Sequence, residues 1–92
     1  MLSNIPINLE KVKPAEINKE ILRIGMIAEL DAVSLYEQLA VMTESEAIKK
    51  ILLDIAREEK THVGEFQALL LDLDKEQADE LEKGRKEVEE KT

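Results

Sequence analysis

The sequence contains no cysteine and no tryptophan, and only one tyrosine, one phenylalanine, two prolines and three glycines in 92 residues. Without cysteine, the chain cannot form a disulfide, a thiolate zinc site, an iron–sulfur cluster or a rubredoxin-type centre. A chain of this length makes one small domain, whose core is marginal unless a metal or another subunit adds to it. The stabilising component must therefore be a metal held by oxygen and imidazole ligands, a partner chain, or both.

The chain is also short of basic residues, because 13 Lys and Arg stand against 21 Asp and Glu, a net charge of −8. This balance argues against nucleic acid and against anionic membrane surfaces as partners, since both require basic protein surface. It favours the attraction of cations. No stretch is long and apolar enough to span a bilayer, and the first residues lack the pattern of a signal peptide, so the expected location is cytoplasmic.

The spacing of apolar residues predicts an all-α chain that begins with an N-terminal arm over residues 1–13. This arm is either disordered or packed on the same or a neighbouring subunit. A long helix is expected over 14–42, with Pro14 in its first turn, where a missing N–H costs nothing. Thr43 is the expected N-cap of the next helix, and Glu46 three residues later completes a capping box.

The second helix is expected to continue to residue 73, so only two or three residues connect it to the first. Such a short connection requires an antiparallel hairpin over residues 14–73. The remainder, residues 74–92, is mostly charged and is expected to form a short C-terminal helix with Asp74 as its cap.

The first helix is apolar around half of its circumference or more, and Ile27, Leu30 and Val41 fall even on its nominally polar side. A helix that is apolar nearly all round must be surrounded by other helices. One partner helix cannot do this, so the pattern predicts an oligomer.

Three polar side chains fall on the apolar faces of the hairpin: Glu29 on the first helix, and Glu59 and His62 on the second. An unpaired buried carboxylate is costly, and neither apolar arc contains Lys or Arg. Glu29 and Glu59 stand at nearly equal distances from the connection, within roughly one helical turn of the same height. His62 projects from the same side of its helix as Glu59. Either the three groups pair with one another, or they hold a metal ion; their meeting at one level favours the metal.

Helical sites that bind two iron ions use one Glu from each of two helices and Glu-x-x-His from each of two others. Glu29 and the pair Glu59 and His62 are half of that set, and a two-fold axis would supply the rest from a second chain. Four carboxylates and two divalent cations form a neutral site, which suits burial. The donor types suit Fe or Mn, and Zn would compete.

The sequence resembles the encapsulated ferritin family, a branch of the ferritin-like superfamily, over residues 14–75. The resemblance is carried by residues 28–32 (AELDA), 35–37 (LYE) and 55–66 (IAREEKTHVGEF). It is also close to the ferritin-like domain at the N-terminus of some archaeal encapsulin shell proteins. It implies two-helix chains that dimerise into a four-helix bundle around a di-iron centre, and dimers that form a ring, typically a decamer. The implied activity is that of a ferroxidase, for iron storage within an encapsulin nanocompartment.

By this resemblance, Glu29, Glu59 and His62 correspond to the iron ligands, Tyr36 to a tyrosine beside the centre, and Asp31 to an acidic residue on the access route of the metal. On the helix, Tyr36 lies only about 20° from Glu29, whereas Asp31 lies about 200° away. Asp31 is therefore either a solvated acid or a group that serves a neighbouring dimer.

Encapsulated cargo usually ends in a short Gly/Leu/Ser-rich docking tail, and residues 87–92 (EVEEKT) have no such pattern. The chain is thus expected to be a fragment of a longer cargo or fusion, or to reach the shell otherwise. Gly25 and Gly64 each cost about 1 kcal/mol in a helix relative to alanine and are expected to mark close helix approach, with Phe66 in the core.

Two other functions compete with the ferroxidase. A rubrerythrin-type peroxidase is disfavoured by the absence of cysteine. The non-enzymatic alternative is a helical scaffold or adaptor whose Glu29, Glu59 and His62 pair with each other or bind structural zinc.

Overall fold

The computed structural model describes Asn4 and residues 8–92, without the side chain of Leu9. The expected N-terminal arm therefore lies largely outside the described residues. Within them the chain forms three α-helices, α1 (Ile17–Met42), α2 (Glu46–Leu73) and α3 (Lys75–Lys91), preceded by two short 3₁₀ helices, η1 (Leu9–Lys11) and η2 (Pro14–Glu16). This part of the chain contains no strand, which confirms the all-α prediction.

The helix boundaries agree with the prediction except at the N-terminus of α2. Pro14 opens η2, which runs directly into α1. The N-cap of α2 is Ser45, whose hydroxyl accepts a hydrogen bond from the Ile48 N–H at 3.3 Å. The prediction of Thr43 as this cap is wrong. The Thr43 hydroxyl instead accepts a hydrogen bond from the Ser45 N–H at 3.1 Å, within the connection between α1 and α2. The helix consequently starts later than a Thr43 cap would start it.

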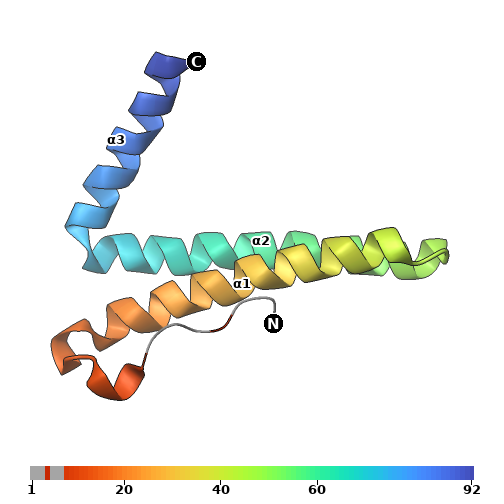
Figure 1. The fold of residues 1–92 in the computed structure, drawn as a ribbon, viewed down its shortest axis with the longest axis horizontal. Coiled ribbons are helices and arrows are strands. Elements are labelled where there is room, and N and C mark those ends of the chain that lie inside the picture. The colour runs from red at the N-terminus through yellow and green to blue at the C-terminus, as the bar shows by residue number, and fades with distance from the viewer. Residues whose placement is uncertain (1–3, 5–7) are drawn as a thin grey trace.

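Helices α1 and α2 run antiparallel and lie side by side along their length, as the short connection predicts (Figure 1). The described side chains that are buried between them are few and mostly small: Val33, Ala40, Ala56 and Leu70. At Gly25 the close approach is confirmed, because an added Cβ would lie 3.1 Å from the ring of Phe66. At Gly64 the prediction is wrong within this chain, since no described atom would lie within 4 Å of such a Cβ. Phe66 itself is half-buried.

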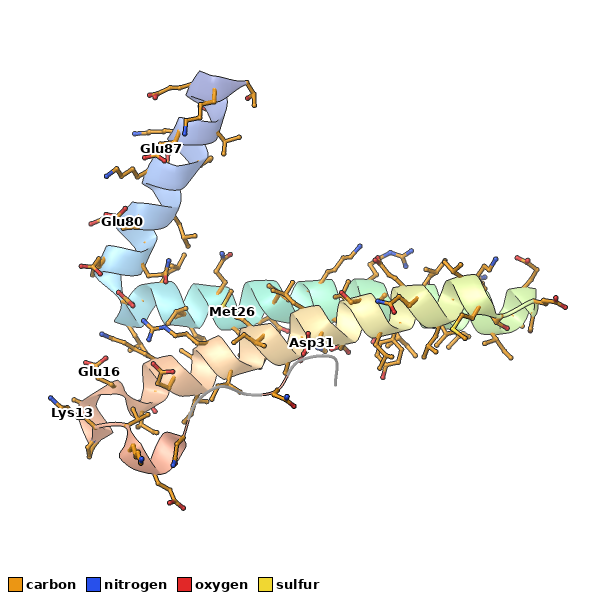
Figure 2. All side chains as sticks on the ribbon, in the orientation of Figure 1. Lys13, Glu16, Met26, Asp31, Glu80 and Glu87 are labelled. Carbon is orange, nitrogen blue, oxygen red and sulfur yellow. The ribbon has the colours of Figure 1, made fainter. Side chains whose placement is uncertain are left out.

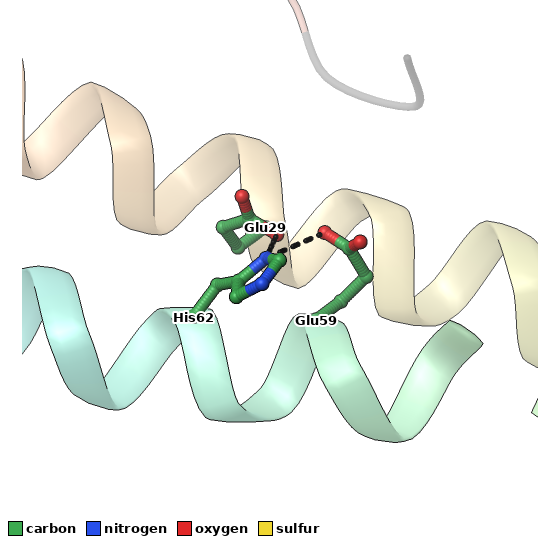
Figure 3. Close-up of side chains that lie close together, drawn as sticks. All are labelled: Glu29, Glu59 and His62. Carbon is green, nitrogen blue, oxygen red and sulfur yellow. Dashed lines mark hydrogen bonds and ion pairs between the residues drawn. The ribbon is translucent and has the colours of Figure 1, made fainter. Parts of the chain in front are cut away.

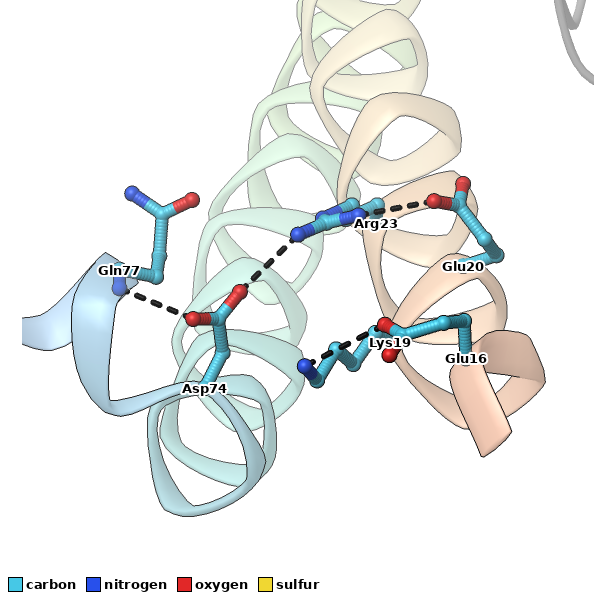
Figure 4. Close-up of polar contacts among 6 residues, drawn as sticks. All are labelled: Glu16, Lys19, Glu20, Arg23, Asp74 and Gln77. Atoms are coloured by element: carbon cyan, nitrogen blue, oxygen red, sulfur yellow. Dashed lines mark hydrogen bonds and ion pairs between the residues drawn. The ribbon is translucent and has the colours of Figure 1, made fainter. Parts of the chain in front are cut away.

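Helix α3 leaves the hairpin at a steep angle and buries none of its residues (Figure 1). Figure 2 shows the side chains of Glu80 and Glu87 projecting from it into open space. Asp74 caps it as predicted, accepting the Gln77 N–H at 3.0 Å. The other carboxylate oxygen of Asp74 pairs with Arg23 of α1 at 2.9 Å (Figure 4). The start of α3 is thus tied to α1 by an ion pair and a cap rather than by a core.

The chain is extended for its size. Its radius of gyration is 16.4 Å, whereas a compact domain of this length has one of roughly 12 Å. Several large apolar side chains are half exposed on the hairpin, among them Ile21, Ile48, Ile51 and Leu69. None of the described helices has the length and apolar character that crossing a membrane would require. A single copy therefore leaves its apolar surface incompletely covered, as the sequence predicts for a subunit of an oligomer.

Candidate metal centre

Glu29, Glu59 and His62 converge between α1 and α2 near the middle of the hairpin (Figure 3). The Nδ1 atom of His62 lies 3.3 Å from Oε2 of Glu29 and 3.6 Å from Oε2 of Glu59. One potential ligand atom from each residue lies within 4.8 Å of the others. The sequence-based prediction that these three side chains meet is therefore confirmed.

Helix geometry explains the convergence. Glu59 and His62 are three residues apart, so they share one side of α2 on successive turns. The antiparallel course of α1 brings Glu29 opposite to them. Both glutamate side chains are 19% exposed and His62 is 44% exposed, so the group is shielded on the hairpin side and open on another.

The charge of the group calls for a cation. Within the described part of the chain, the ion pairs of Glu29 and Glu59 involve His62 and no Lys or Arg. A nearby base, Lys60, instead pairs with Glu37 at 3.0 Å. Two carboxylates and one imidazole therefore retain net negative charge even with the imidazole protonated. Two oxygens and one imidazole nitrogen suit Fe, Mn or Zn, so the residues fit the metals that the sequence predicts.

Among the described residues, no other three or more His, Asp or Glu side chains bring their potential ligand atoms this close together. The sequence reasoning therefore missed no additional cluster of donors within this chain. Three protein donors with an open side are a partial coordination sphere, since di-iron sites of this type use two single Glu residues and two Glu-x-x-His pairs, one of each more than this chain provides.

The other two candidate residues, Tyr36 and Asp31, lie outside this group of three side chains. Tyr36 is half-buried on α1, seven residues after Glu29. Seven residues are close to two full helical turns, so Tyr36 and Glu29 share one side of α1. Asp31 is half-buried, and its position two residues after Glu29 puts it on another face of α1. The structure thus brings together the three predicted ligands but does not bring Asp31 into the group.

A helical hairpin with a glutamate on one helix and Glu-x-x-His on the other is the half-unit of a ferritin-like metal protein. Comparison with known proteins agrees: the chain belongs to the rubrerythrin family of ferritin-like proteins, whose sequence profile matches residues 20–92.

Two similar proteins sharpen this assignment. The chain superposes on the crystal structure of an encapsulated ferritin domain from Pyrococcus furiosus with a TM-score of 0.82 and 56% sequence identity, covering 98% of this chain and 92% of that one. It is also 58% identical over 94 residues to a ferritin-like-encapsulin shell fusion protein of the same organism. That match covers 100% of this chain but 27% of the fusion protein, so the chain spans about a quarter of that relative. The predicted resemblance to encapsulated ferritins is confirmed.

Proposed function

We propose that this chain is a ferroxidase, which oxidises Fe(II) to Fe(III) with dioxygen at a di-iron centre shared by two copies of the chain. The observation that carries the proposal is the meeting of Glu29, Glu59 and His62 within 4.8 Å. Iron is here the substrate: two ferrous ions supply two electrons, and dioxygen accepts them. Membership of a ferritin-like family supports iron over the other metals that suit these donors.

The residues of this chain would bind the ions and neutralise their charge. By resemblance to the family, Glu59 suits a bridging position, and Glu29 and His62 suit more terminal ones. With the same three residues of a second copy opposite, four carboxylates would balance two divalent ions. Tyr36 is proposed to lie beside the centre, where its hydroxyl can hydrogen-bond to a ligand carboxylate.

The second copy is proposed to cover one apolar side of the hairpin. Six large, exposed side chains share the side of the helices toward which His62 points. We call them the apolar strip: Ile21, Leu39, Ile48, Ile51, Leu69 and Leu73. Pairing two such strips would build a four-helix bundle and would close the open side of the metal group. Burial of apolar side chains contributes roughly 25 cal/mol per Å², so the strip and the shared ions would stabilise the same dimer.

The proposed setting is an encapsulin compartment, in which a ring of such dimers, typically a decamer, delivers oxidised iron for storage. Support comes from the Pyrococcus furiosus relative, which is described as a fusion of a ferritin-like part with an encapsulin shell. The net charge of −8 suits a protein that draws in ferrous ions. Asp31 is proposed to assist their access from a neighbouring dimer.

The activity is tested by adding Fe(II) anaerobically to the purified chain, then admitting air and following ferric absorbance. Iron is expected to oxidise faster with the wild-type chain than in buffer alone. With Glu29→Ala or His62→Ala, the rate of iron oxidation is expected to fall to that in buffer alone. Lys60→Ala is the matched control, because it removes an exposed cross-helix ion pair of the same hairpin. Equal rates in wild type and in the two ligand variants would refute the ferroxidase.

The same experiment separates the ferroxidase from a scaffold bridged by a structural metal. The contacts of His62 with both glutamates are compatible with a site that binds metal without turnover. A scaffold would bind Zn(II) or Fe(II), and assemble with it, yet would leave the rate of iron oxidation at the buffer value.

A further inference from the structure

A close contact between Gly25 of α1 and Phe66 of α2 lies next to the metal group. An ideal Cβ at Gly25 would stand 3.1 Å from Cζ and 3.2 Å from Cδ1 and Cδ2 of the Phe66 ring. The ring thus lies directly over the backbone of α1, in the space where any other residue would carry its side chain. Separations this short require the neighbour to give by a few tenths of an ångström.

The contact is in register with the ligands. Gly25 precedes Glu29 by four residues, and Phe66 follows His62 by four, so each lies one helical turn from a ligand on the same side of its helix. Because the helices are antiparallel, the Gly25–Phe66 contact forms the next layer of the hairpin beyond the Glu29–His62 contact. On the other side of the site, the layers contain the buried small residue Ala56 and the buried Val33.

We propose that Phe66, seated on the backbone of Gly25, is a positioning residue that fixes the separation of α1 and α2 at the metal centre. The inference rests on the proposed function in one respect, since the group that it positions is the proposed iron site. Phe66 donates nothing to a metal. Its ring sets how near Glu29 approaches Glu59 and His62, and ligand atoms must be placed to within about 0.2 Å for a good site.

The choice of glycine is informative because glycine is unfavourable in a helix interior. Gly64 and Gly84 are also helical, but no described atom would lie within 4 Å of a Cβ at either position. Of the three glycines, Gly25 therefore has a steric reason for lacking a side chain, and that reason is the aromatic ring beside the site.

The test is Gly25→Ala, with Gly64→Ala and Gly84→Ala as controls that make the same chemical change where there is space. Binding of Co(II) to the metal-free chain is measured by calorimetry, and the visible spectrum of the bound Co(II) reports ligand geometry. Gly25→Ala is expected to weaken binding about tenfold, as changes just outside a ligand shell commonly do, and to shift the spectrum. The two control variants are expected to match wild type in both.

Two further variants separate positioning from general packing. Phe66→Leu alone is expected to weaken Co(II) binding, because no ring then fixes the helix separation. Gly25→Ala with Phe66→Leu is expected to bind better than Gly25→Ala, since the smaller side chain makes room for the added methyl. A packing role alone would lower the thermal midpoint of the metal-free chain and leave affinity and spectrum unchanged, which would overturn the proposal.

The outcomes also distinguish this proposal from the ferroxidase. If wild type binds Co(II) and oxidises iron while Gly25→Ala binds like wild type, the positioning role fails and the ferroxidase stands. If wild type binds Co(II) without oxidising iron and Gly25→Ala weakens binding, the ferroxidase fails and the positioning role stands. A wild-type chain that binds no metal overturns both.

Discussion

His62 on α2 and Glu29 on α1 are joined across the hairpin, with Nδ1 of the imidazole 3.3 Å from Oε2 of the carboxylate. The same nitrogen lies 3.6 Å from Oε2 of Glu59. One imidazole thus stands between two carboxylates whose described ion pairs include no Lys or Arg. Removing that imidazole would leave two carboxylates facing each other in a half-buried site, which makes His62 the most informative single position to change.

We expect His62→Ala to weaken binding of Zn(II) or anaerobic Fe(II) at least tenfold, because the variant loses the nitrogen donor and keeps the repelling carboxylates. If the site is shared by two chains, the metal should also cease to promote dimers, since bound metal contributes to assembly. Calorimetry and sedimentation velocity, with and without metal, measure the two effects.

Lys60→Ala is the control for that change, because Lys60 also links α2 to α1, through Glu37, but does so on exposed surface. Exposed ion pairs contribute little, so this variant should bind and assemble like wild type. A His62→Ala chain that still bound metal with wild-type affinity would show that these three residues are not the ligand set.

The apolar strip can be tested at Ile51, which is 57% exposed on α2. Ile51→Glu would place a charge in the proposed dimer interface, and it is expected to raise the dimer dissociation constant by a hundredfold or more, because burying an unpaired charge is costly. Sedimentation equilibrium of the metal-free chain measures the change.

Thr61→Glu is the matched control, since Thr61 is exposed outside the apolar strip, about 80° around α2 from Ile51, and the change adds the same charge. It should leave the dimer intact. If both variants dissociate equally, the effect is one of net charge, and the strip is not the interface. If neither dissociates, a second copy does not cover this side.

The sequence was sufficient to predict the hairpin and the meeting of three potential ligands because both depend on local, periodic signals. The 3.6-residue period gives each helix its faces, and a polar residue inside an apolar arc is visible without any structure. Glu29, Glu59 and His62 were identifiable in this way, and the short connection then determined that they would meet.

Other features depend on contacts that no period reveals. The start of α3 is joined to α1 by the pairing of Arg23 with Asp74, residues 51 apart in the sequence. Gly25 and Gly64 are alike as helical glycines, and only the position of the Phe66 ring distinguishes them. The start of α2 was misplaced because Thr43 and Ser45 are both good caps, and their competition is settled by the turn that Thr43 makes.

That competition gives a prediction about stability. Ser45→Ala removes the hydroxyl that accepts the Ile48 N–H, and it should lower the free energy of unfolding by about 1 kcal/mol, as N-cap removal typically does. Thr43→Ala should cost less, because its hydroxyl serves a turn and not a helix terminus. Urea unfolding of the metal-free chain, followed by circular dichroism at fixed protein concentration, measures both. Equal losses, or a larger loss for Thr43→Ala, would favour Thr43 as the effective cap.

The attachment of α3 is expected to depend on pH through Asp74. The Gln77 N–H that donates to its carboxylate, together with the nearby charges of Lys19 and Arg23, holds the pKa of Asp74 below its ordinary value despite the opposing effect of partial burial. The folded state therefore favours the ionised form. Its contribution to stability is complete above the pKa of the unfolded chain and is lost as the pH falls through the lower folded pKa.

The expected result is that the start of α3 loosens only in acid, below about pH 4, where carboxyl groups titrate. The amide resonance of Gln77, followed by NMR over a pH titration, reports the state of Asp74 because this N–H donates directly to its carboxylate. Arg23→Met should move the midpoint upward, because one of the charges that favour ionised Asp74 is gone. Asp74→Asn should remove the transition at Gln77 while still capping the helix. A wild-type midpoint at or above that of an ordinary aspartate would contradict the link between Asp74, Arg23 and the direction of α3.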